Sequence, residues 1–127
     1  MRIMHTMYRV LDTDRSVDFY EKVFGWKIVR QTYLGDQALN TFVGPDDQSD
    51  ILELTMNYGR TEPYEMGEAY GHIAVEVPDL DELLDRLESA GIAPEKPPFR
   101  VRENGPRLCF IRDPDNYRIE LTESKPA

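Results

Sequence analysis

Residues 51–55 read ILELT and residues 118–122 read RIELT, so almost the same five residues occur twice in a chain of 127. Each copy places a glutamate, Glu53 or Glu120, between two aliphatic residues. Successive side chains of a β-strand point to opposite faces of the sheet. If both copies are strands, each glutamate therefore lies on the face opposite its aliphatic neighbours. Because aliphatic side chains need apolar cover, we expect helices on their face and the glutamates on the other.

The duplication extends well beyond these two strands. The two glutamates are 67 positions apart, and two further pairs of residues have the same spacing. One pair is formed by the only two histidines, His5 and His72, and the other by two aspartates that open helix-like stretches, Asp12 and Asp79. Three coincidences at a single offset indicate a tandem duplication.

Each half is predicted to have the same order of elements. In the first half a strand at 3–10 precedes a helix at 12–25 and strands at 26–34, 38–44 and 50–57. In the second half a strand at 71–77 precedes a helix at 79–91, a weak strand at 92–96 and clear strands at 107–111 and 117–122. The pattern predicts an α+β fold in which tandem βαβββ modules form a curled mixed sheet. We expect one domain with modules at 1–58 and 70–123 and a linker at 59–69, which is rich in Gly, Pro and charge.

The predicted helices each have an apolar stripe and an aspartate that can cap the first turn. Val17, Tyr20 and Phe24 share one face of the first helix. In the second helix the stripe consists of four leucines at positions 80, 83, 84 and 87.

Composition excludes several classes of function. The net charge of −9 gives a surface that repels nucleic-acid backbones and anionic lipids, so neither partner is expected. No apolar run has the length of a membrane span or a signal peptide, which predicts a cytoplasmic protein. The single cysteine, Cys109, lies in the apolar stretch LCFI and is expected to be a buried structural residue.

The duplicated histidines and glutamates form a candidate metal site. If His5, Glu53, His72 and Glu120 converge, they supply two imidazoles and two carboxylates. This set leaves positions open on a six-coordinate ion such as nickel, cobalt, manganese or iron, and zinc also accepts it. A lone histidine or glutamate on a strand is usually a surface residue. Its repetition at equivalent positions favours the metal site, because buried carboxylates need a partner.

Two further polar residues lie on the same predicted faces. Arg9 is two pleats beyond His5 and could hold an anionic substrate, and Asn57 is two pleats beyond Glu53. A surface arginine and a turn asparagine are the alternatives for these two residues.

With these motifs, the chain resembles the lactoylglutathione lyases (glyoxalase I) of the vicinal oxygen chelate superfamily, in their short bacterial form. The resemblance covers roughly residues 1–122 and is carried by MRIMHTMYRV, DRSVDFYEKVFGWK, ILELTMNYG, YEMGEAYGHIAVEV and FIRDPDNYRIEL. It implies that His5, Glu53, His72 and Glu120 are the metal ligands. It also implies a homodimer in which each metal lies between subunits, and activation by nickel or cobalt more than by zinc.

The resemblance also implies the reaction. Methylglyoxal and glutathione combine spontaneously into a hemithioacetal, which such enzymes isomerise through an enediolate to S-lactoylglutathione. Glu120 is then expected to be the catalytic base, with Glu53 in the mirror role for the other hemithioacetal enantiomer. Arg9 and Asn57 match positions that hold the glutamyl part of glutathione.

The chain departs from the family pattern at several positions. The usual Asn-Trp-Gly is Asn-Tyr-Gly at 57–59, and the loop that usually carries Lys-Gly-Gly reads Arg-Glu-Asn-Gly at 102–105. Arg102 could replace the lysine as a contact for the carboxylate of the thiol, whereas Glu103 opposes that charge. Asn116 stands where glycine is usual, and asparagine tolerates the left-handed backbone of such a turn.

Three alternative functions remain open on the sequence. The scaffold could serve another metalloenzyme, such as a thiol transferase or an extradiol dioxygenase, although these typically use only three protein ligands. A metal-free drug-binding resistance protein would not need both His/Glu pairs. The isomerase could also use a different thiol or aldehyde.

Overall fold

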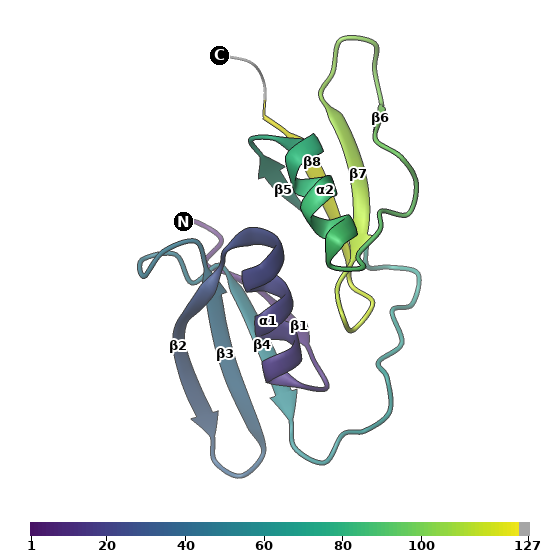
Figure 1. Ribbon diagram of the computed structural model, residues 1–127. Coiled ribbons are helices and arrows are strands. Elements are labelled where there is room, and N and C mark those ends of the chain that lie inside the picture. Colours follow the sequence, from purple (N-terminus) through teal and green to yellow (C-terminus); the bar gives the residue numbers. More distant parts are fainter. Residues whose placement is uncertain (125–127) are drawn as a thin grey trace. The chain divides into compact units, whose positions relative to one another are not determined.

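The computed structural model describes residues 1–124. The chain divides into two compact units whose boundary lies between Glu65 and Met66, and each unit holds one helix and one four-stranded sheet (Figure 1). The first unit comprises β1 (Thr6–Arg9), α1 (Thr13–Phe24), β2 (Lys27–Leu34), β3 (Ala38–Gly44) and β4 (Leu52–Asn57). The second unit comprises β5 (Ile73–Val77), α2 (Leu80–Ser89), β6 (Phe99–Arg100), β7 (Arg107–Arg112) and β8 (Arg118–Glu123).

The two sheets have the same topology. Their strand orders are β1-β4-β3-β2 and β5-β8-β7-β6. In each sheet the first strand runs parallel to the fourth, and the remaining pairs are antiparallel. The predicted α+β fold with tandem βαβββ modules is therefore confirmed.

The helices begin at the two duplicated aspartates. Asp12 and Asp79 are the N-caps of α1 and α2, and their carboxylates accept hydrogen bonds from the backbone N–H of Arg15 at 3.1 Å and of Glu82 at 3.0 Å. Helix α1 ends at Gly25, whose φ of 72° is left-handed.

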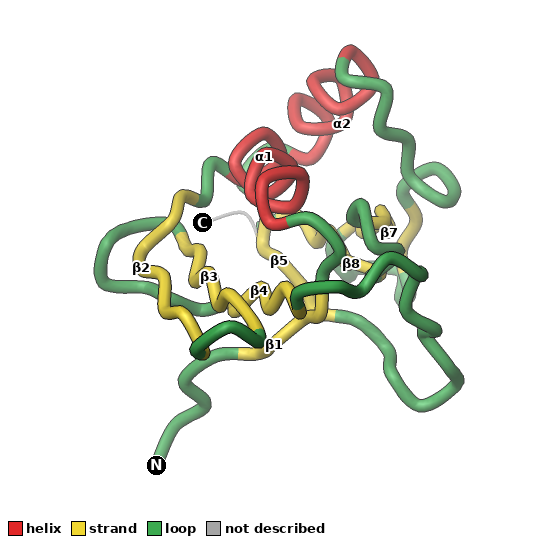
Figure 2. The backbone as a smooth tube through the Cα atoms, turned by 90° about the horizontal axis from the view of Figure 1, so that it is seen from below, coloured by secondary structure: helices red, strands yellow, loops and turns green. Residues whose placement is uncertain are grey.

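The helices cover the aliphatic face of each sheet, as the strand alternation predicts. Leu52 and Leu54 of β4, and Ile119 and Leu121 of β8, are at most 1% exposed. Figure 2 shows α1 on one side of the strands of its sheet, which it contacts through β2, β3 and β4, and α2 contacts β8. The glutamates that alternate with these residues consequently lie on the sheet face that the helix does not cover.

The predicted stripe of α1 is only partly buried. Val17 and Phe24 are only partly buried, and Tyr20 is fully buried. The buried side of the helix is made instead by Thr13, Ser16, Phe19, Tyr20 and Val23. Small residues at the start of the helix allow close contact with the sheet, and the Phe24 ring at its end packs against Trp26, 4.8 Å away between centroids. In α2 three of the four predicted leucines are buried and Leu84 is half-buried.

The structure also differs from the prediction at one edge strand and at the starts of β1 and β5. The weak strand at 92–96 is absent, and the edge strand of the second sheet is instead the short β6, Phe99–Arg100. Pro94 cannot donate to a strand ladder, so this segment is fixed to β7 by a single backbone bond, from Glu95 N to Phe110 O at 2.8 Å. The two histidines lie one residue before β1 and β5 rather than within them.

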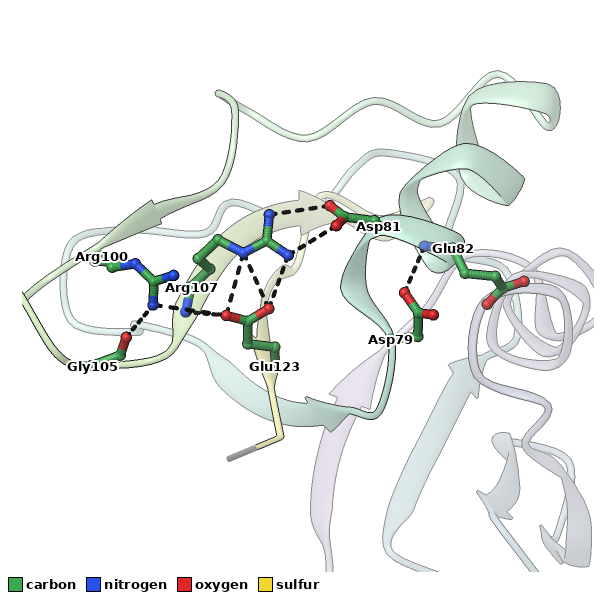
Figure 3. A network of polar contacts seen from close by, with 7 residues as sticks. All are labelled: Asp79, Asp81, Glu82, Arg100, Gly105, Arg107 and Glu123. Atoms are coloured by element: carbon green, nitrogen blue, oxygen red, sulfur yellow. Dashed lines mark hydrogen bonds and ion pairs between the residues drawn. The ribbon is translucent and has the colours of Figure 1, made fainter. Parts of the chain in front are cut away.

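Arg107 of β7 joins the second helix to the last strand (Figure 3). Its guanidinium donates to both carboxylate oxygens of Asp81 in α2 at 3.1 Å, and to Glu123 of β8 at 3.0–3.3 Å. These contacts raise the pKa of Arg107 and lower that of Glu123. Arg100 extends the network, because it donates to the carbonyl oxygen of Gly105 and lies 3.9 Å from Glu123.

The chain's cysteine is buried and free, as predicted. Within residues 1–124, neither helix combines the length and the apolar character that crossing a membrane requires.

Candidate metal centre

The first half-site is the pair His5 and Glu53. The Nε2 atom of His5 lies 3.4 Å from Oε1 of Glu53, with the two side chains 29% and 14% exposed. The other oxygen of Glu53 accepts a hydrogen bond of 2.5 Å from the hydroxyl of Thr55. This threonine is two residues along β4 and therefore on the same face. The carboxylate is thus held with one oxygen on the threonine and the other beside the imidazole.

The second half-site repeats this arrangement in the other unit. The Nε2 atom of His72 lies 2.9 Å from Oε2 of Glu120, and Oε1 of Glu120 accepts a hydrogen bond of 2.7 Å from Thr122. The glutamate and threonine of each half are the E and T of the duplicated ELT sequence. No role was predicted for these threonines, although their i+2 spacing from each candidate glutamate was the available signal.

The donor atoms fit a divalent metal. Two ligand atoms that each lie about 2.1 Å from one ion are roughly 3.0 Å apart at a right angle and roughly 3.4 Å apart at a tetrahedral angle. The nitrogen-to-oxygen distances of the two pairs, 3.4 and 2.9 Å, correspond to these values. Neutral imidazole and carboxylate are suitable ligands for nickel, cobalt and zinc.

Each half-site alone supplies two ligands. Among residues 1–124, no three histidine, cysteine, aspartate or glutamate side chains form a cluster that could hold a metal ion. The structure therefore forms the two predicted pairs, and the convergence of His5, Glu53, His72 and Glu120 on one ion stays a prediction.

Each histidine also contacts a phenylalanine that the sequence analysis missed. The ring of His5 meets that of Phe42 at a centroid distance of 5.1 Å, and His72 meets Phe110 at 5.0 Å. In the strand register Phe42 lies opposite Glu53 and Phe110 opposite Glu120. The phenylalanines are 68 positions apart, one more than the repeat, and this shift is why the 67-residue offset did not find them.

The two predicted substrate-binding residues of the first unit are brought together. Arg9 at the end of β1 donates a hydrogen bond from Nη1 to Oδ1 of Asn57 at the end of β4, at 2.9 Å. Both follow the half-site along their strands, on the face that carries Glu53. The pair thus presents a guanidinium and an amide beside the candidate metal ligands.

Arg102 lies in the second unit, in the turn between β6 and β7. It is exposed and borders a hollow of about 540 Å³. Other residues that line the hollow include Arg100, Asn104 and Ser124. Arg102 of this loop thus borders the hollow together with Arg100 of β6 and the carboxylate of Glu123.

The turn before β8 keeps its shape despite the asparagine at its centre. Asn116 has a φ of 75° and is the one residue other than glycine with a positive φ in the described part of the chain. The carboxylate of Asp113 accepts the backbone N–H groups of Asp115 and Tyr117, each at 2.9 Å. This turn leads directly into the strand that carries Glu120, and the expected tolerance of asparagine is confirmed.

Comparison with known proteins identifies the class to which this fold and these pairs belong. The sequence profile of the Glyoxalase/Bleomycin resistance protein/Dioxygenase superfamily matches residues 2–121. The chain therefore belongs to this superfamily.

Individual relatives show which family within this superfamily the chain resembles. Lactoylglutathione lyase of Escherichia coli O157:H7 is 39% identical in an alignment that covers 100% of this chain and 96% of that protein. The lactoylglutathione lyase of Neisseria meningitidis Z2491 is 42% identical, covering 98% of this chain and 92% of that protein. The structure of the trypanothione-dependent glyoxalase I of Leishmania major superposes with a TM-score of 0.80 at 40% identity, over 97% of this chain and 86% of that one. The predicted resemblance to the short bacterial lactoylglutathione lyases is confirmed.

Proposed function

We propose that this chain is a metal-dependent lactoylglutathione lyase, which isomerises the hemithioacetal of methylglyoxal and glutathione to S-lactoylglutathione. The observation that carries the proposal is the pair of matched half-sites, in which His Nε2 lies beside a Glu carboxylate at both copies of the repeat. A metal-free binding protein has no need for both pairs. The full-length relatives named lactoylglutathione lyase support the same reaction. We place this detoxification of methylglyoxal in the cytoplasm.

We propose that the metal ion is held by four residues, His5 and Glu53 of one subunit together with His72 and Glu120 of a second copy of the chain. One unit alone supplies two donor residues, and the unit of the second copy would supply the other two. We expect Ni²⁺ to be the native ion, with Co²⁺ and Zn²⁺ as alternatives, because the donor set leaves open positions on a six-coordinate ion.

An exposed apolar surface next to the first half-site supports the dimer. Ile3 and Met4 are 91% and 68% exposed, and Ile51 is 40% exposed. The backbone bond from Thr6 N to Ile51 O, at 3.1 Å, holds the two segments side by side. Such a patch beside His5 is suited to burial against a second copy.

The chemistry is a proton transfer between adjacent carbons. A divalent cation bound by these donors supplies electrostatic stabilisation of the negative charge that develops on two neighbouring substrate oxygens. The carboxylate of Glu120 removes the proton from the hemithioacetal carbon and returns it to the neighbouring carbonyl carbon. The hydroxyl proton passes from the first oxygen to the second, so that substrate and product are isomers and no oxidant is consumed.

Each of the two glutamates accepts a hydrogen bond from the threonine two residues further along its strand. Glu53 accepts its 2.5 Å bond from a threonine that is 5% exposed and that also lies 3.2 Å from the Asn40 amide. Glu120 accepts a longer bond, of 2.7 Å, from the half-buried Thr122. The other oxygen of Glu120 lies 2.9 Å from its histidine and that of Glu53 lies 3.4 Å from its own, so both carboxylates are held at both oxygens. Glu53 would take the mirror role for the other enantiomer.

Arg9 and Asn57 are proposed to hold the glutamyl end of the thiol. Their hydrogen bond orients the guanidinium, a group whose planar donors suit the binding of a carboxylate. Arg102 is proposed as the contact for the carboxylate at the other end of the thiol. Because its loop differs from the family pattern and one structural relative is trypanothione-dependent, the thiol itself is the part of the substrate that most needs a test.

An absorbance assay of thioester formation tests the proposal. Chelator-treated protein is supplied with methylglyoxal and glutathione, together with nickel, cobalt, zinc or no metal. We expect turnover only with metal, and about one bound ion per chain. In Glu120→Gln we expect kcat to fall by at least about a thousandfold, as for removal of a general base. Metal-independent turnover, or near-normal activity of Glu120→Gln, would refute it. Trypanothione in place of glutathione identifies the preferred thiol.

A further inference from the structure

Behind each histidine of the candidate metal centre lies the same stack of side chains. The phenylalanine that meets His5 or His72 edge-to-face is covered by an arginine. The guanidinium carbon of Arg30 lies 3.6 Å from the centre of the Phe42 ring, and that of Arg118 lies 3.7 Å from the centre of the Phe110 ring. These are close cation–π contacts.

Each arginine is in turn held by a carboxylate. The Nε atom of Arg30 donates to Oδ2 of Asp50 at 2.9 Å, and that of Arg118 donates to Oε2 of Glu95 at 2.8 Å. The arginines lower the pKa of both carboxyl groups. The order histidine, phenylalanine, arginine, carboxylate is therefore complete in both units.

The duplication does not explain why both stacks contain an arginine. Arg30 comes from β2, and the residue 67 positions later is Pro97. Arg118 comes from β8, and the residue 67 positions earlier is Ile51. Two strands that are not equivalent in the repeat thus each place an arginine guanidinium over the phenylalanine ring of their unit. This independent repetition points to a function that both half-sites share.

The stability of the fold does not explain the stacks either. Arg30 and Asp50 are 46% and 36% exposed, and Arg118 and Glu95 are 36% and 31% exposed. Ion pairs as exposed as these contribute little to folding. Their shared feature is that each fixes the ring against which a candidate metal ligand rests.

We propose that Arg30 and Arg118 are positioning residues for metal binding. Each guanidinium fixes a phenylalanine ring, and that ring holds the imidazole so that Nε2 faces the glutamate carboxylate. This inference rests on the proposed metal site. Groups outside the ligands that orient a metal-binding histidine are known to set metal affinity.

The test measures metal affinity rather than turnover. Arg30→Met and Arg118→Met keep an unbranched apolar stem but lose the charge and the planar group. Arg86→Met is the matched control, because Arg86 lies in α2 and pairs with Glu82 of the same helix. Nickel affinity of the metal-free proteins is measured by competition with a chromophoric chelator, and their Tm is measured without metal.

We expect both stack variants to bind nickel about tenfold more weakly, at the low end of the effect of outer groups on metal sites. Their metal-free Tm should stay close to that of Arg86→Met, whose affinity should match wild type. The visible spectrum of the cobalt-substituted protein should change in the stack variants alone, because it reports ligand geometry.

The outcomes separate this inference from the proposed function. If the wild-type chain binds no nickel, cobalt or zinc, the metal site fails and the inference fails with it. If wild type binds and both stack variants bind within threefold of it, only the positioning role is refuted. Where a Met variant does not fold, Asp50→Asn and Glu95→Gln remove the carboxylates that hold Arg30 and Arg118. Nickel affinities within twofold of wild type in both of these variants would equally refute the positioning role.

Discussion

The hydroxyl of Thr122 donates a 2.7 Å hydrogen bond to Oε1 of Glu120, while Oε2 of the same carboxylate lies 2.9 Å from Nε2 of His72. The threonine therefore sets the rotation of the carboxylate that we assign as the catalytic base. The next residue of β8, Glu123, binds Arg107. Successive side chains of a strand point to opposite faces, so Thr122 lies on the face away from the Arg107 network.

Removal of this hydroxyl should slow catalysis without unfolding the protein. Thr122→Val keeps the shape of the side chain and loses one hydrogen bond to a charged group, which is worth about 1.5–3 kcal/mol. We expect kcat/KM to fall about tenfold, equivalent to about 1.4 kcal/mol of transition-state stabilisation. Steady-state kinetics measure this, with Thr32→Val on the exposed part of β2 as the control. Equal kinetics in the two variants would show that Glu120 does not depend on the hydroxyl.

The hydrogen bond between Arg9 and Asn57 leads to a prediction about substrate affinity. Arg9→Met removes the guanidinium, and Asn57→Ala removes the group that orients it. Under the proposed assignment both residues bind a part of the substrate distant from the reacting carbons, so their loss should weaken the binding of ground and transition states equally. We expect KM for the hemithioacetal to rise about tenfold in Arg9→Met, and less in Asn57→Ala, with kcat nearly unchanged. A fall in kcat at constant KM would place these residues in the chemical step instead.

Much of the fold followed from two regular features of the sequence. The alternation in ILELT and RIELT predicted which face of each sheet is covered, and the single 67-residue offset predicted both His/Glu pairs and both helix caps. These features are local or periodic, so they can be read without knowledge of tertiary contacts. The ELT repeat also contained the threonine contacts, which needed only the i+2 rule to be found.

The rest of the site depends on contacts that have no sequence period. Phe42 and Phe110 are displaced from the repeat by one residue, and Arg30 and Arg118 reach equivalent places from different strands. The buried side of α1 also includes Thr13 and Ser16, polar residues that apolar spacing alone does not select. The proposed joining of the two half-sites across a subunit interface involves a second copy of the chain, which no repeat or alternation within the sequence encodes.

The carboxylate of Glu123 in the Arg107 network should make the fold sensitive to acid. Hydrogen bonds from Arg107 lower the pKa of Glu123 below its ordinary value of 4.5. A carboxyl group whose pKa is lower in the folded state stabilises the protein fully above the unfolded value. This contribution is lost as the pH falls through the folded value.

We therefore expect the free energy of unfolding to fall as the pH is lowered below about 4.5. Glu123→Gln, which cannot titrate, should be less stable than wild type at pH 7 and should lose less stability on acidification. Urea denaturation at pH 7 and pH 3.5 measures both differences. Glu88→Gln is the control, because Glu88 is exposed on α2 outside the Arg107 network. An equal loss in wild type and Glu123→Gln would show that the network does not carry this pH dependence.

Cys109 should be inert to thiol reagents in the folded protein. Its side chain is fully buried on β7 opposite Leu121, and burial raises the pKa of the thiol above its ordinary value. Both effects reduce the population of accessible thiolate, the form that reacts. With Ellman's reagent at pH 8 we expect reaction at least about a hundredfold slower in the native protein than in denaturant, because attack requires opening of the core. The same sample in denaturant confirms that the thiol is reduced. Rapid native reaction would mean that β7 opens readily beside the strand that carries Glu120.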